Sequence, residues 1–204
     1  MRGPMSDDLS TAEYWNALYL KGDTGWDKGV CSPPIARLLK EAIAPKGARL
    51  AVIGAGRGHE AVEAARLGYR VSAIDFAEEA ARGVAAAASK AGVELEVLQE
   101  DLFKLPKRRP AHYDAVVEQT CFCAIAVERR PEYVEAVHAL LKPGGVLFGL
   151  FYAHGNPGGP PFDTHEDELR RLFSARFELV RLVRAADSFD QRAGKEVEAV
   201  FTAR

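Results

Sequence analysis

Three glycines at residues 54–58 form the first pattern in the chain that could bind a ligand. They follow a short apolar run, RLAVI at Arg49–Ile53, which reads as a buried strand, and they precede a stretch of helical composition. Glycines at a turn between a strand and a helix let the backbone turn sharply and let a ligand approach without Cβ clashes. The unpaired N–H groups of the helix then lie near that ligand. The loop predicts a ligand site at Gly54 and Gly56, and a plain tight turn is the alternative.

An acidic residue follows this loop at a spacing typical of nucleotide sites. Asp75 ends the next predicted strand, RVSAID, about 20 residues downstream of the glycines, where a carboxylate can accept hydrogen bonds from ribose hydroxyls. The same side chain can also cap the helix that is expected to begin near Ala77, and one role does not exclude the other. Loop and acid together favour a ligand that carries a nucleoside.

The glycine spacing separates two ligands of this kind. The fingerprint of NAD-binding loops is G-x-G-x-x-G, whereas this loop reads G-x-G-x-G and places His59 where the third glycine would fall. A bulky side chain there disfavours close packing of helix against strand beside a pyrophosphate. The pattern therefore favours S-adenosylmethionine (SAM) over NAD. After the next strand, Asp101 and Leu102 can bond an adenine amino group and cover its face, or they can belong to an exposed loop.

Helices and strands alternate around these residues. Helices are expected at Ser10–Leu20, Ser32–Ala44, His59–Leu67, Ala77–Ala91, Arg130–Leu141 and His165–Phe173, and strands at Arg49–Ile53, Arg70–Asp75, Leu95–Gln99, Tyr113–Glu118, Val146–Phe151 and in the runs FELVRLV and EVEAVFTA. Such alternation predicts right-handed βαβ crossovers and a parallel sheet with helices on both faces. The last two strands have no helix between them, which indicates a hairpin. We therefore expect an α/β, Rossmann-like fold with a mostly parallel seven-stranded sheet, one antiparallel edge strand and an N-terminal helical lid.

Composition and charge argue against several classes of protein. The 204 residues contain no Pro/Gly/Ser linker, so we expect a single domain at 1–204, with a helical lid region at 1–45 and a core at 46–204. The net charge is -2 with both signs interleaved, which argues against nucleic acid as a partner. Three cysteines without zinc-like spacing argue against a metal site and a disulfide framework. No apolar run approaches about 18 residues and the N-terminus lacks a signal-like segment, so we expect a cytoplasmic protein without a membrane span.

Five segments of the chain resemble one known family. They are GWDKGVCSPP from Gly25, GAGRGHEA from Gly54, CFCAI from Cys121, LLKPGG from Leu140 and GGPPF from Gly158. With these segments the chain resembles the thiopurine S-methyltransferase family, in particular its thiol/halide methyltransferase branch, over nearly its whole length. LLKPGG is common to class I SAM-dependent methyltransferases, whereas GWDKG and GGPPF are much more specific. The resemblance implies SAM as the cofactor and the class I methyltransferase fold.

The resemblance also implies roles for aromatic residues near the N-terminus. Trp15 and Tyr19 match positions on the family's N-terminal helix that close over the cofactor, and their spacing of four places both on one helical face. Anchoring that helix to a core is the alternative role for both. Trp26 matches an aromatic residue at the boundary between cofactor and methyl acceptor. Tyr19 departs from the tryptophan frequent in the family but keeps an aromatic face.

Further matched positions concern the cofactor and the acceptor. Arg130 matches an arginine near the acceptor pocket, where it can hold or neutralise an anionic nucleophile, and a solvent-facing charge at the start of a helix is the alternative. Gln119 stands where plant thiol/halide members tend to have tyrosine. This departure leaves the acceptor open and makes Gln119 a candidate for the acceptor pocket beside Trp26 and Arg130. The positions that match cofactor contacts are Gly54, Asp75, Asp101 and Leu102.

A soft nucleophile suits this set of residues as the methyl acceptor. A thiolate, hydrosulfide or halide needs no enzymic base to attack a sulfonium, so alignment and desolvation carry the reaction and no certain catalytic residue is expected. Aromatic faces suit a sulfonium by cation–π attraction, worth about 0.5–2 kcal/mol. We expect a monomeric methyltransferase acting on a small molecule: a thiol, hydrosulfide, halide or thiopurine-like compound.

Three alternatives remain open from the sequence. An O- or N-methyltransferase of a small metabolite needs a base, for which His154 or His165 is the candidate. A non-catalytic sensor would bind SAM without methylating any acceptor. An NAD-dependent oxidoreductase would share the general fold, and His59 in the glycine loop argues against it.

Calorimetric titration of the purified protein with SAM, S-adenosylhomocysteine and NAD tests the cofactor prediction. We expect saturable binding of the first two ligands and none of NAD, because the loop lacks the third glycine of the dinucleotide fingerprint. Binding of NAD alone would overturn the interpretation from the glycine loop onward.

Overall fold

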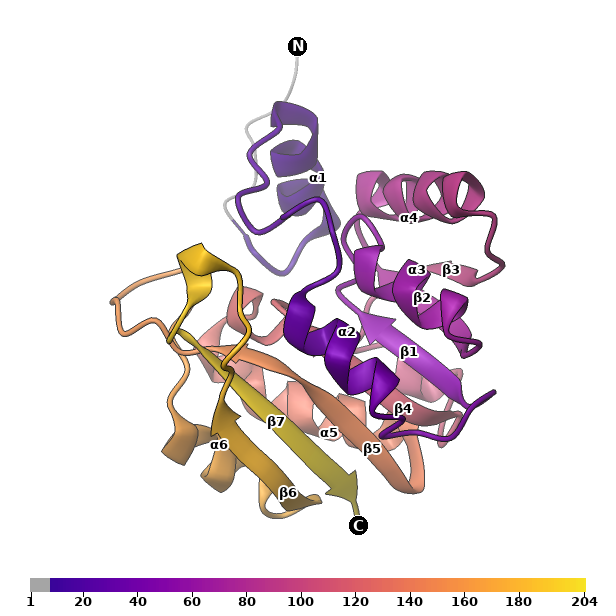
Figure 1. Ribbon diagram of the computed structural model, residues 1–204. Coiled ribbons are helices and arrows are strands. Elements are labelled where there is room, and N and C mark those ends of the chain that lie inside the picture. Colours follow the sequence, from indigo (N-terminus) through magenta and orange to yellow (C-terminus); the bar gives the residue numbers. More distant parts are fainter. Residues whose placement is uncertain (1–7) are drawn as a thin grey trace.

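A computed structural model describes residues 8–204 and shows one sheet with helices on both sides (Figure 1). The N-terminal end of the predicted lid region, residues 1–7, lies outside the described part of the chain. The strands are β1 Arg49–Ile53, β2 Arg70–Asp75, β3 Glu96–Gln99, β4 Tyr113–Gln119, β5 Leu141–Tyr152, β6 Phe177–Arg184 and β7 Glu196–Ala203. The helices are α1 Ala12–Lys21, α2 Pro33–Lys40, α3 His59–Arg66, α4 Glu78–Ala91, α5 Arg130–Leu140 and α6 Glu166–Phe173, and short turns of 3-10 helix include η2 Phe122–Ala124 and η4 Asp190–Arg192.

The strand order is β3-β2-β1-β4-β5-β7-β6. Strands β1 to β5 run parallel, and β7 runs antiparallel to both β5 and β6. In Figure 1 the arrowhead of β7 accordingly points away from that of β1. The predicted Rossmann-like fold with a terminal hairpin is confirmed. The antiparallel strand lies one position in from the edge, because the hairpin folds back so that β7 pairs with β5 and leaves β6 outermost.

Alternate residues of the strands face two hydrophobic cores. Leu50 and Val52 belong to the core beneath α2, α3 and α4, whereas Ile53 belongs to the core beneath α5 and α6. This period of two is what a strand buried on both faces produces. On the second face Phe173 of α6 stacks on Phe201 of β7, with 4.5 Å between ring centroids. Helices therefore cover both faces of the sheet, as predicted.

Two element boundaries differ from the prediction by more than two residues. β5 begins at Leu141 rather than Val146, because Leu141 already pairs with Tyr113 and an irregularity in β4 absorbs the following glycines. α2 ends at Lys40, because Ala42 adopts a left-handed φ of 55° that an α-helix cannot contain. Neither feature is visible in the hydrophobic pattern.

The carboxyl ends of the parallel strands meet beneath α1 (Figure 1). The chain crosses from β1 to β2 on one side, and β4 lies on the other side of β1. In open α/β sheets such a reversal of strand order leaves a crevice at the carboxyl ends, where ligands bind. The fold therefore places the ends of β1, β2 and β4 around one site.

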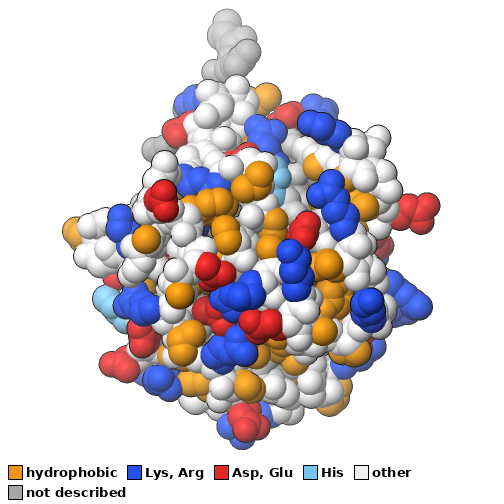
Figure 2. Space-filling model, viewed as in Figure 1, with side chains coloured by type: hydrophobic (Ala, Val, Ile, Leu, Met, Phe, Trp, Pro, Cys, Tyr) orange, Lys and Arg blue, Asp and Glu red, His pale blue; other side chains and the backbone are white. Residues whose placement is uncertain are grey.

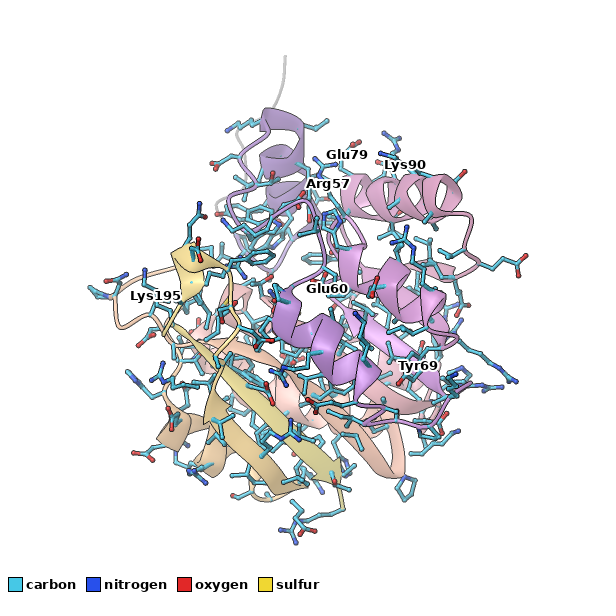
Figure 3. The ribbon with its side chains drawn as sticks, in the orientation of Figure 1. Arg57, Glu60, Tyr69, Glu79, Lys90 and Lys195 are labelled. Atoms are coloured by element: carbon cyan, nitrogen blue, oxygen red, sulfur yellow. The ribbon has the colours of Figure 1, made fainter. Side chains whose placement is uncertain are left out.

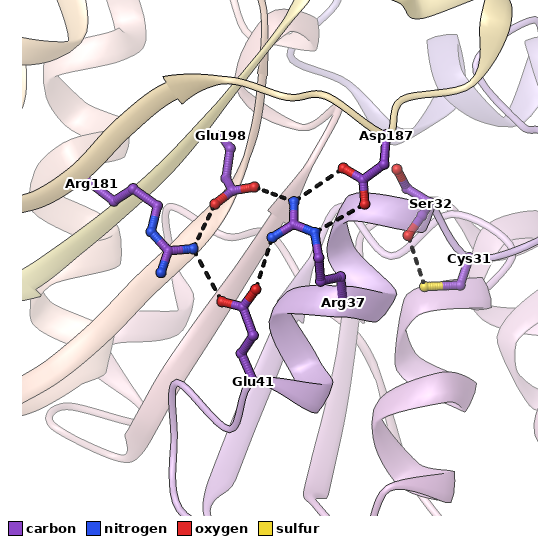
Figure 4. Close-up of polar contacts among 7 residues, drawn as sticks. All are labelled: Cys31, Ser32, Arg37, Glu41, Arg181, Asp187 and Glu198. Carbon is purple, nitrogen blue, oxygen red and sulfur yellow. Dashed lines mark hydrogen bonds and ion pairs between the residues drawn. The ribbon is translucent and has the colours of Figure 1, made fainter.

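A group of ion pairs ties α2 to the terminal hairpin (Figure 4). Glu198 of β7 has a side chain only 3% exposed and accepts hydrogen bonds from Arg37 of α2 and Arg181 of β6. Asp187 accepts two further bonds from Arg37, at 3.0 and 3.1 Å. Segments far apart in the sequence are thus joined around one buried carboxylate.

The surface in Figure 2 shows acidic and basic side chains interspersed on the same face, with hydrophobic side chains scattered among them. No single-sign patch dominates this view. Within residues 8–204, no helix combines the length and the apolar character that crossing a bilayer requires.

Replacing the shared carboxylate tests the role of these ion pairs. We expect Glu198→Ala to lower the free energy of unfolding by about 2 kcal/mol, because it removes charge-assisted hydrogen bonds to both arginines. Glu41→Ala is the matched control, since Glu41 pairs with the same two arginines but its side chain is 37% exposed. Its expected cost is below about 1 kcal/mol. Chemical denaturation measures both, and equal costs would contradict the interpretation.

Candidate active site

A cavity of about 850 Å³ opens at the carboxyl ends of the strands. Segments distant in the sequence line it: α1 and the loop after it, the ends of β1 and β2, and the loops that follow β3, β4 and β5. Of the eight residues predicted to contact the cofactor, seven line this cavity: Trp15, Tyr19, Trp26, Gly54, Asp75, Asp101 and Leu102. The eighth, Gly56, lines a smaller neighbouring cavity.

The glycine loop is needed for close packing as well as for the turn. A Cβ on Gly54 would lie 2.8 Å from the Cβ of Cys121 and 2.9 Å from its Sγ, and the φ of Gly54 is 56°. A side chain is therefore excluded twice, by contact and by backbone conformation. Gly58 also lies close to α4, since its Cβ would lie 3.1 Å from the Cα of Val84. The first approach brings the ends of β1 and β4 together, and the second places the start of α3 against α4.

Asp75 holds the glycine loop and the start of α4. Its Oδ2 accepts the N–H of Gly56 and its Oδ1 the N–H of Ala77, each at 3.0 Å. Burial raises the pKa of Asp75 to about 6, and these two N–H groups partly oppose the rise. The carboxylate lines the cavity and keeps acceptor capacity beyond these two bonds. It can therefore bind ribose hydroxyls while it also orders the helix start.

Three aromatic residues cluster at the mouth of the cavity. The ring of Trp26 meets Trp15 and Tyr19 edge-on, with 5.6 Å between centroids in each pair.

α1 is attached to α4 by Asn16, whose Oδ1 accepts the N–H of Glu79 at 3.0 Å (Glu79 is labelled in Figure 3). This bond satisfies an N–H in the first turn of α4 that has no partner within its own helix.

The loop after β4 forms the floor of the cavity and is held by Glu118. One oxygen of this fully buried carboxylate accepts the N–H groups of Cys121 and Phe122 at 2.8 and 2.9 Å, and the other accepts the hydroxyl of Tyr133 at 2.6 Å. Burial raises the pKa of Glu118 to about 7, against the lowering effect of these bonds. Between strand and loop, Thr120 has a φ of 59°, a strained conformation for a side-chain-bearing residue.

The structure assigns Arg130 a place behind the cavity wall. This arginine is 1% exposed, bonds Glu168 through Nη1 at 2.7 and 2.9 Å, and donates from Nη2 to the carbonyl of Asp163. It lies 4.5 Å above the ring of Phe122 and does not line the cavity. The expected contact with an acceptor is thus replaced by support for the GGPPF loop.

Gln119 also lies outside the main cavity. It lines the small neighbouring cavity, where its Oε1 is buried without a hydrogen-bond partner among the described residues. Among the residues predicted for the acceptor pocket, Trp26 alone lines the main cavity.

Two other arginines, which were not predicted from the sequence, line the cavity. Arg129 lies 3.8 Å above the ring of Phe103. Arg192 of η4 is 5% exposed and bonds the carbonyl of Trp26 at 2.8 Å and the carboxylate of Glu196 at 3.1 Å. Tyr152, at the end of β5, faces the same region. The adjacent arginines in ERRP were the one sequence feature that indicated an arginine near the acceptor. The sequence does not determine which of the two faces the cavity.

The two histidines considered as bases lie elsewhere. His154 bonds the carbonyl of Pro161 at 3.2 Å, and His165 is mostly exposed beside Asp163. Neither lines the cavity. This placement disfavours the alternative that requires one of them to remove a proton from a hard acceptor.

Comparison with known proteins decides the family. The sequence model of the thiopurine S-methyltransferase (TPMT) family matches residues 10–204. Over 190 residues the chain is 32% identical to thiocyanate methyltransferase 1 of Brassica oleracea. The matched region covers 89% of this chain and 81% of that protein. It is 26% identical over 190 residues to thiopurine S-methyltransferase of Azotobacter vinelandii, covering 86% and 87% of the two chains. The chain belongs to the thiopurine S-methyltransferase family.

Solved structures confirm the fold of this family member. A Burkholderia thailandensis 1,6-didemethyltoxoflavin-N1-methyltransferase, solved with S-adenosylhomocysteine, matches with a TM-score of 0.79 at 19% identity, over 100% of this chain and 93% of that one. The magnesium protoporphyrin IX methyltransferase of Synechocystis, solved with SAM, matches with a TM-score of 0.76 at 14% identity over both full chains. The fold is that of class I SAM-dependent methyltransferases, and the family member is a SAM-dependent enzyme.

The cavity residues of this family member fit SAM. Gly54 leaves the space that a Cβ would fill, the buried carboxylate of Asp75 lines the wall, and three aromatic rings stand at the mouth. Together they offer a hydrogen-bond acceptor for ribose and π faces for a sulfonium.

The pH dependence of S-adenosylhomocysteine binding tests the role of Asp75. The ionised carboxylate is the better acceptor, so we expect affinity to be constant above about pH 7 and to fall about tenfold at pH 5, one unit below the pKa of about 6. Asp75→Asn should bind more weakly and lose this dependence in calorimetric titrations. Glu78→Gln, an exposed neighbour on α4, is the control and should keep it. An unchanged pH profile in Asp75→Asn would contradict the assignment.

Proposed function

We propose that this enzyme transfers the methyl group of SAM to a small soft nucleophile: a thiol, hydrosulfide, halide or thiopurine-like sulfur. One observation carries the proposal, namely the kinds of side chain that line the cavity beside the predicted cofactor contacts. Cys121, Cys123 and Tyr152 lie there with Arg129 and Arg192, and no histidine among residues 8–204 lines the cavity. Polarisable, largely apolar walls with positive charges suit soft anions.

The thiols of this wall stay protonated and do not act as nucleophiles themselves. Burial raises the pKa of Cys123 to about 12 and raises that of Cys121 well above its usual range, and the nearby carboxylate of Glu118 adds to both. A thiol is a nucleophile only when ionised. The two side chains therefore serve as a neutral, polarisable surface for the acceptor.

The arginines draw an anionic acceptor inward. Arg192 is buried, and charges act more strongly in a pocket of low dielectric constant than in water. Its bonds to Glu196 and to the carbonyl of Trp26 fix its position. SAM, when bound, supplies a methyl group on a positively charged sulfur, so alignment and desolvation of a soft anion suffice for its transfer.

The relatives support this choice of acceptor by their names. Those from Brassica oleracea and Azotobacter vinelandii are named for methylation of thiocyanate and of thiopurines, and both compounds offer sulfur as the nucleophile. An oxygen or nitrogen acceptor would need a base, and the two histidines considered for it lie outside the cavity.

The organisation of the chain belongs to the same proposal. Region 1–45 acts as a lid on the core at 46–204, because α1 and the loop after it form one side of the cavity and bond the core through Asn16 and Trp26. The interleaved surface charges favour a small molecule over nucleic acid as the partner. We further propose a cytoplasmic monomer, in which the cavity is lined by residues from α1 to η4 of the same chain.

An acceptor screen tests the function. With SAM present, we expect methylation of hydrosulfide, thiocyanate, iodide or aromatic thiols. Gas chromatography of the methylated product, or the formation of S-adenosylhomocysteine, measures the reaction. His154→Gln and His165→Gln should keep activity within about twofold, because soft anions need no base. Arg129→Gln should raise KM for anionic acceptors about tenfold with little change in kcat. SAM binding without methylation of any such acceptor would overturn the proposal.

A further inference from the structure

A second cavity of about 50 Å³ adjoins the main one on the side of α3. Trp26, Lys28, Gly54 and Thr120 line both, so the two cavities meet beside the ends of β1 and β4. Glu60, in the first turn of α3, lines the small cavity only. Figure 3 shows Glu60 between the start of α2 and the start of α3.

The polar groups of this small cavity are incompletely bonded. Glu60 accepts the N–H of Ser32 at 3.0 Å and its own backbone N–H, whereas a carboxylate has about four acceptor positions. The Oε1 of Gln119 is buried and has no partner within residues 8–204. Polar atoms of this kind are normally satisfied by ordered water, and a water occupies about 30 Å³. The cavity therefore has the size and the polar lining to hold a water beside Glu60.

Partly exposed polar side chains line the small cavity together with Glu60. His59 and Asp27 line the same small cavity and bond one another at 2.9 Å, and the side chain of His59 is one quarter exposed, at 25%. Arg57 joins Asp27 at 3.1 Å from the opposite side. A proton that reaches Glu60 can leave through these exposed groups.

Burial and the neighbouring charges together determine the pKa of Glu60. Burial raises the pKa of Glu60, and the charges of His59 and Arg192 oppose the rise. Lys28 is the remaining cation on the cavity wall. Cys31 lies close by, and burial together with Glu60 raises the pKa of its thiol, so this thiol does not compete as an anion.

We propose that Glu60 accepts, through a water in the small cavity, the proton that a neutral thiol loses on methylation. As the new S–CH3 bond forms and the methyl–sulfonium bond breaks, the electron pair of that bond stays on the departing thioether. The S–H proton passes to the water, and a proton of the water passes to the carboxylate of Glu60 and then to solvent. The inference rests on the proposed function. It assigns a task only for protonated acceptors, because a halide or thiocyanate carries no proton to lose.

Glu60→Gln tests this role, since the amide oxygen can still accept the N–H of Ser32. At about pH 7, we expect turnover of an alkyl thiol, with a pKa near 8.5, to fall at least tenfold, whereas turnover of iodide stays within about twofold. The loss should shrink along a series of thiols of falling pKa. It should also shrink for one thiol as the pH rises. Glu63→Gln, one turn further along α3 and paired with Arg66, is the matched control and should change neither acceptor.

A second readout needs no turnover. In the ligand-free protein, the infrared band of a protonated carboxyl should titrate above the usual range of glutamic acid, and the wild-type minus Glu60→Gln difference spectrum should isolate it. Affinity for S-adenosylhomocysteine should be equal in the two proteins.

Selective loss with neutral thiols, together with the infrared band, supports the relay. A parallel loss for thiol and iodide, or no loss for either, would overturn it while leaving the proposed function intact. Failure of the wild-type enzyme to methylate any thiol or halide would overturn both.

Discussion

The contact between the ends of β1 and β4 is the constraint on which the site depends. Gly54 and Cys121 approach so closely that one additional carbon on the glycine would lie 2.8 Å from the cysteine Cβ. The loop after β4 can take that position because Glu118 satisfies the N–H groups of Cys121 and Phe122 from within the core. Once these two strand ends are joined, the crevice at the reversal of strand order becomes a cavity with a closed floor.

Two buried carboxylates shape this floor at an electrostatic cost. Burial raises the pKa of Asp75 to about 6 and that of Glu118 to about 7, so both groups favour protonation in the fold more than they do in water. Each orders backbone at the site: the glycine loop for Asp75 and the loop after β4 for Glu118. Because the folded pKa values are raised, protonation of these two groups favours the folded state. The stability that this protonation contributes is fully present below the unfolded pKa values and is lost as pH rises through the folded values. The site therefore trades stability near neutral pH for fixed loops.

Much of the fold follows from the sequence because its signals are local. The bounds of β1 and β2 agree with the prediction, since each apolar run ends at a glycine or an acid that also marks the site. Gly54 and Asp75 were predicted in the same way, from type and spacing, whereas Trp26 was predicted from the resemblance to the family. The start of β5 was not, because Leu141 joins the sheet through its pairing with Tyr113, a contact between distant parts of the chain.

The acceptor end was predicted less well for a geometric reason. Successive residues around the start of a helix point about 100° apart, so of the adjacent Arg129 and Arg130 one faces the cavity and the other the core. Only the packed structure decides which. Arg192 comes from η4, far from both in the chain, and reaches the site through the carbonyl of Trp26.

That last bond also links the two ends of the cavity through one segment of the chain. Trp26 contacts Trp15 and Tyr19 on its aromatic edges, and its carbonyl holds the buried arginine on the other side. Lys28, two residues later, bonds Gln191 of the same η4 turn at 2.9 Å. The segment from α1 to Lys28 has few buried side chains of its own and depends on these contacts for its position. The aromatic cluster and the buried arginine therefore share Trp26 as a common support, so the position of one depends on that of the other.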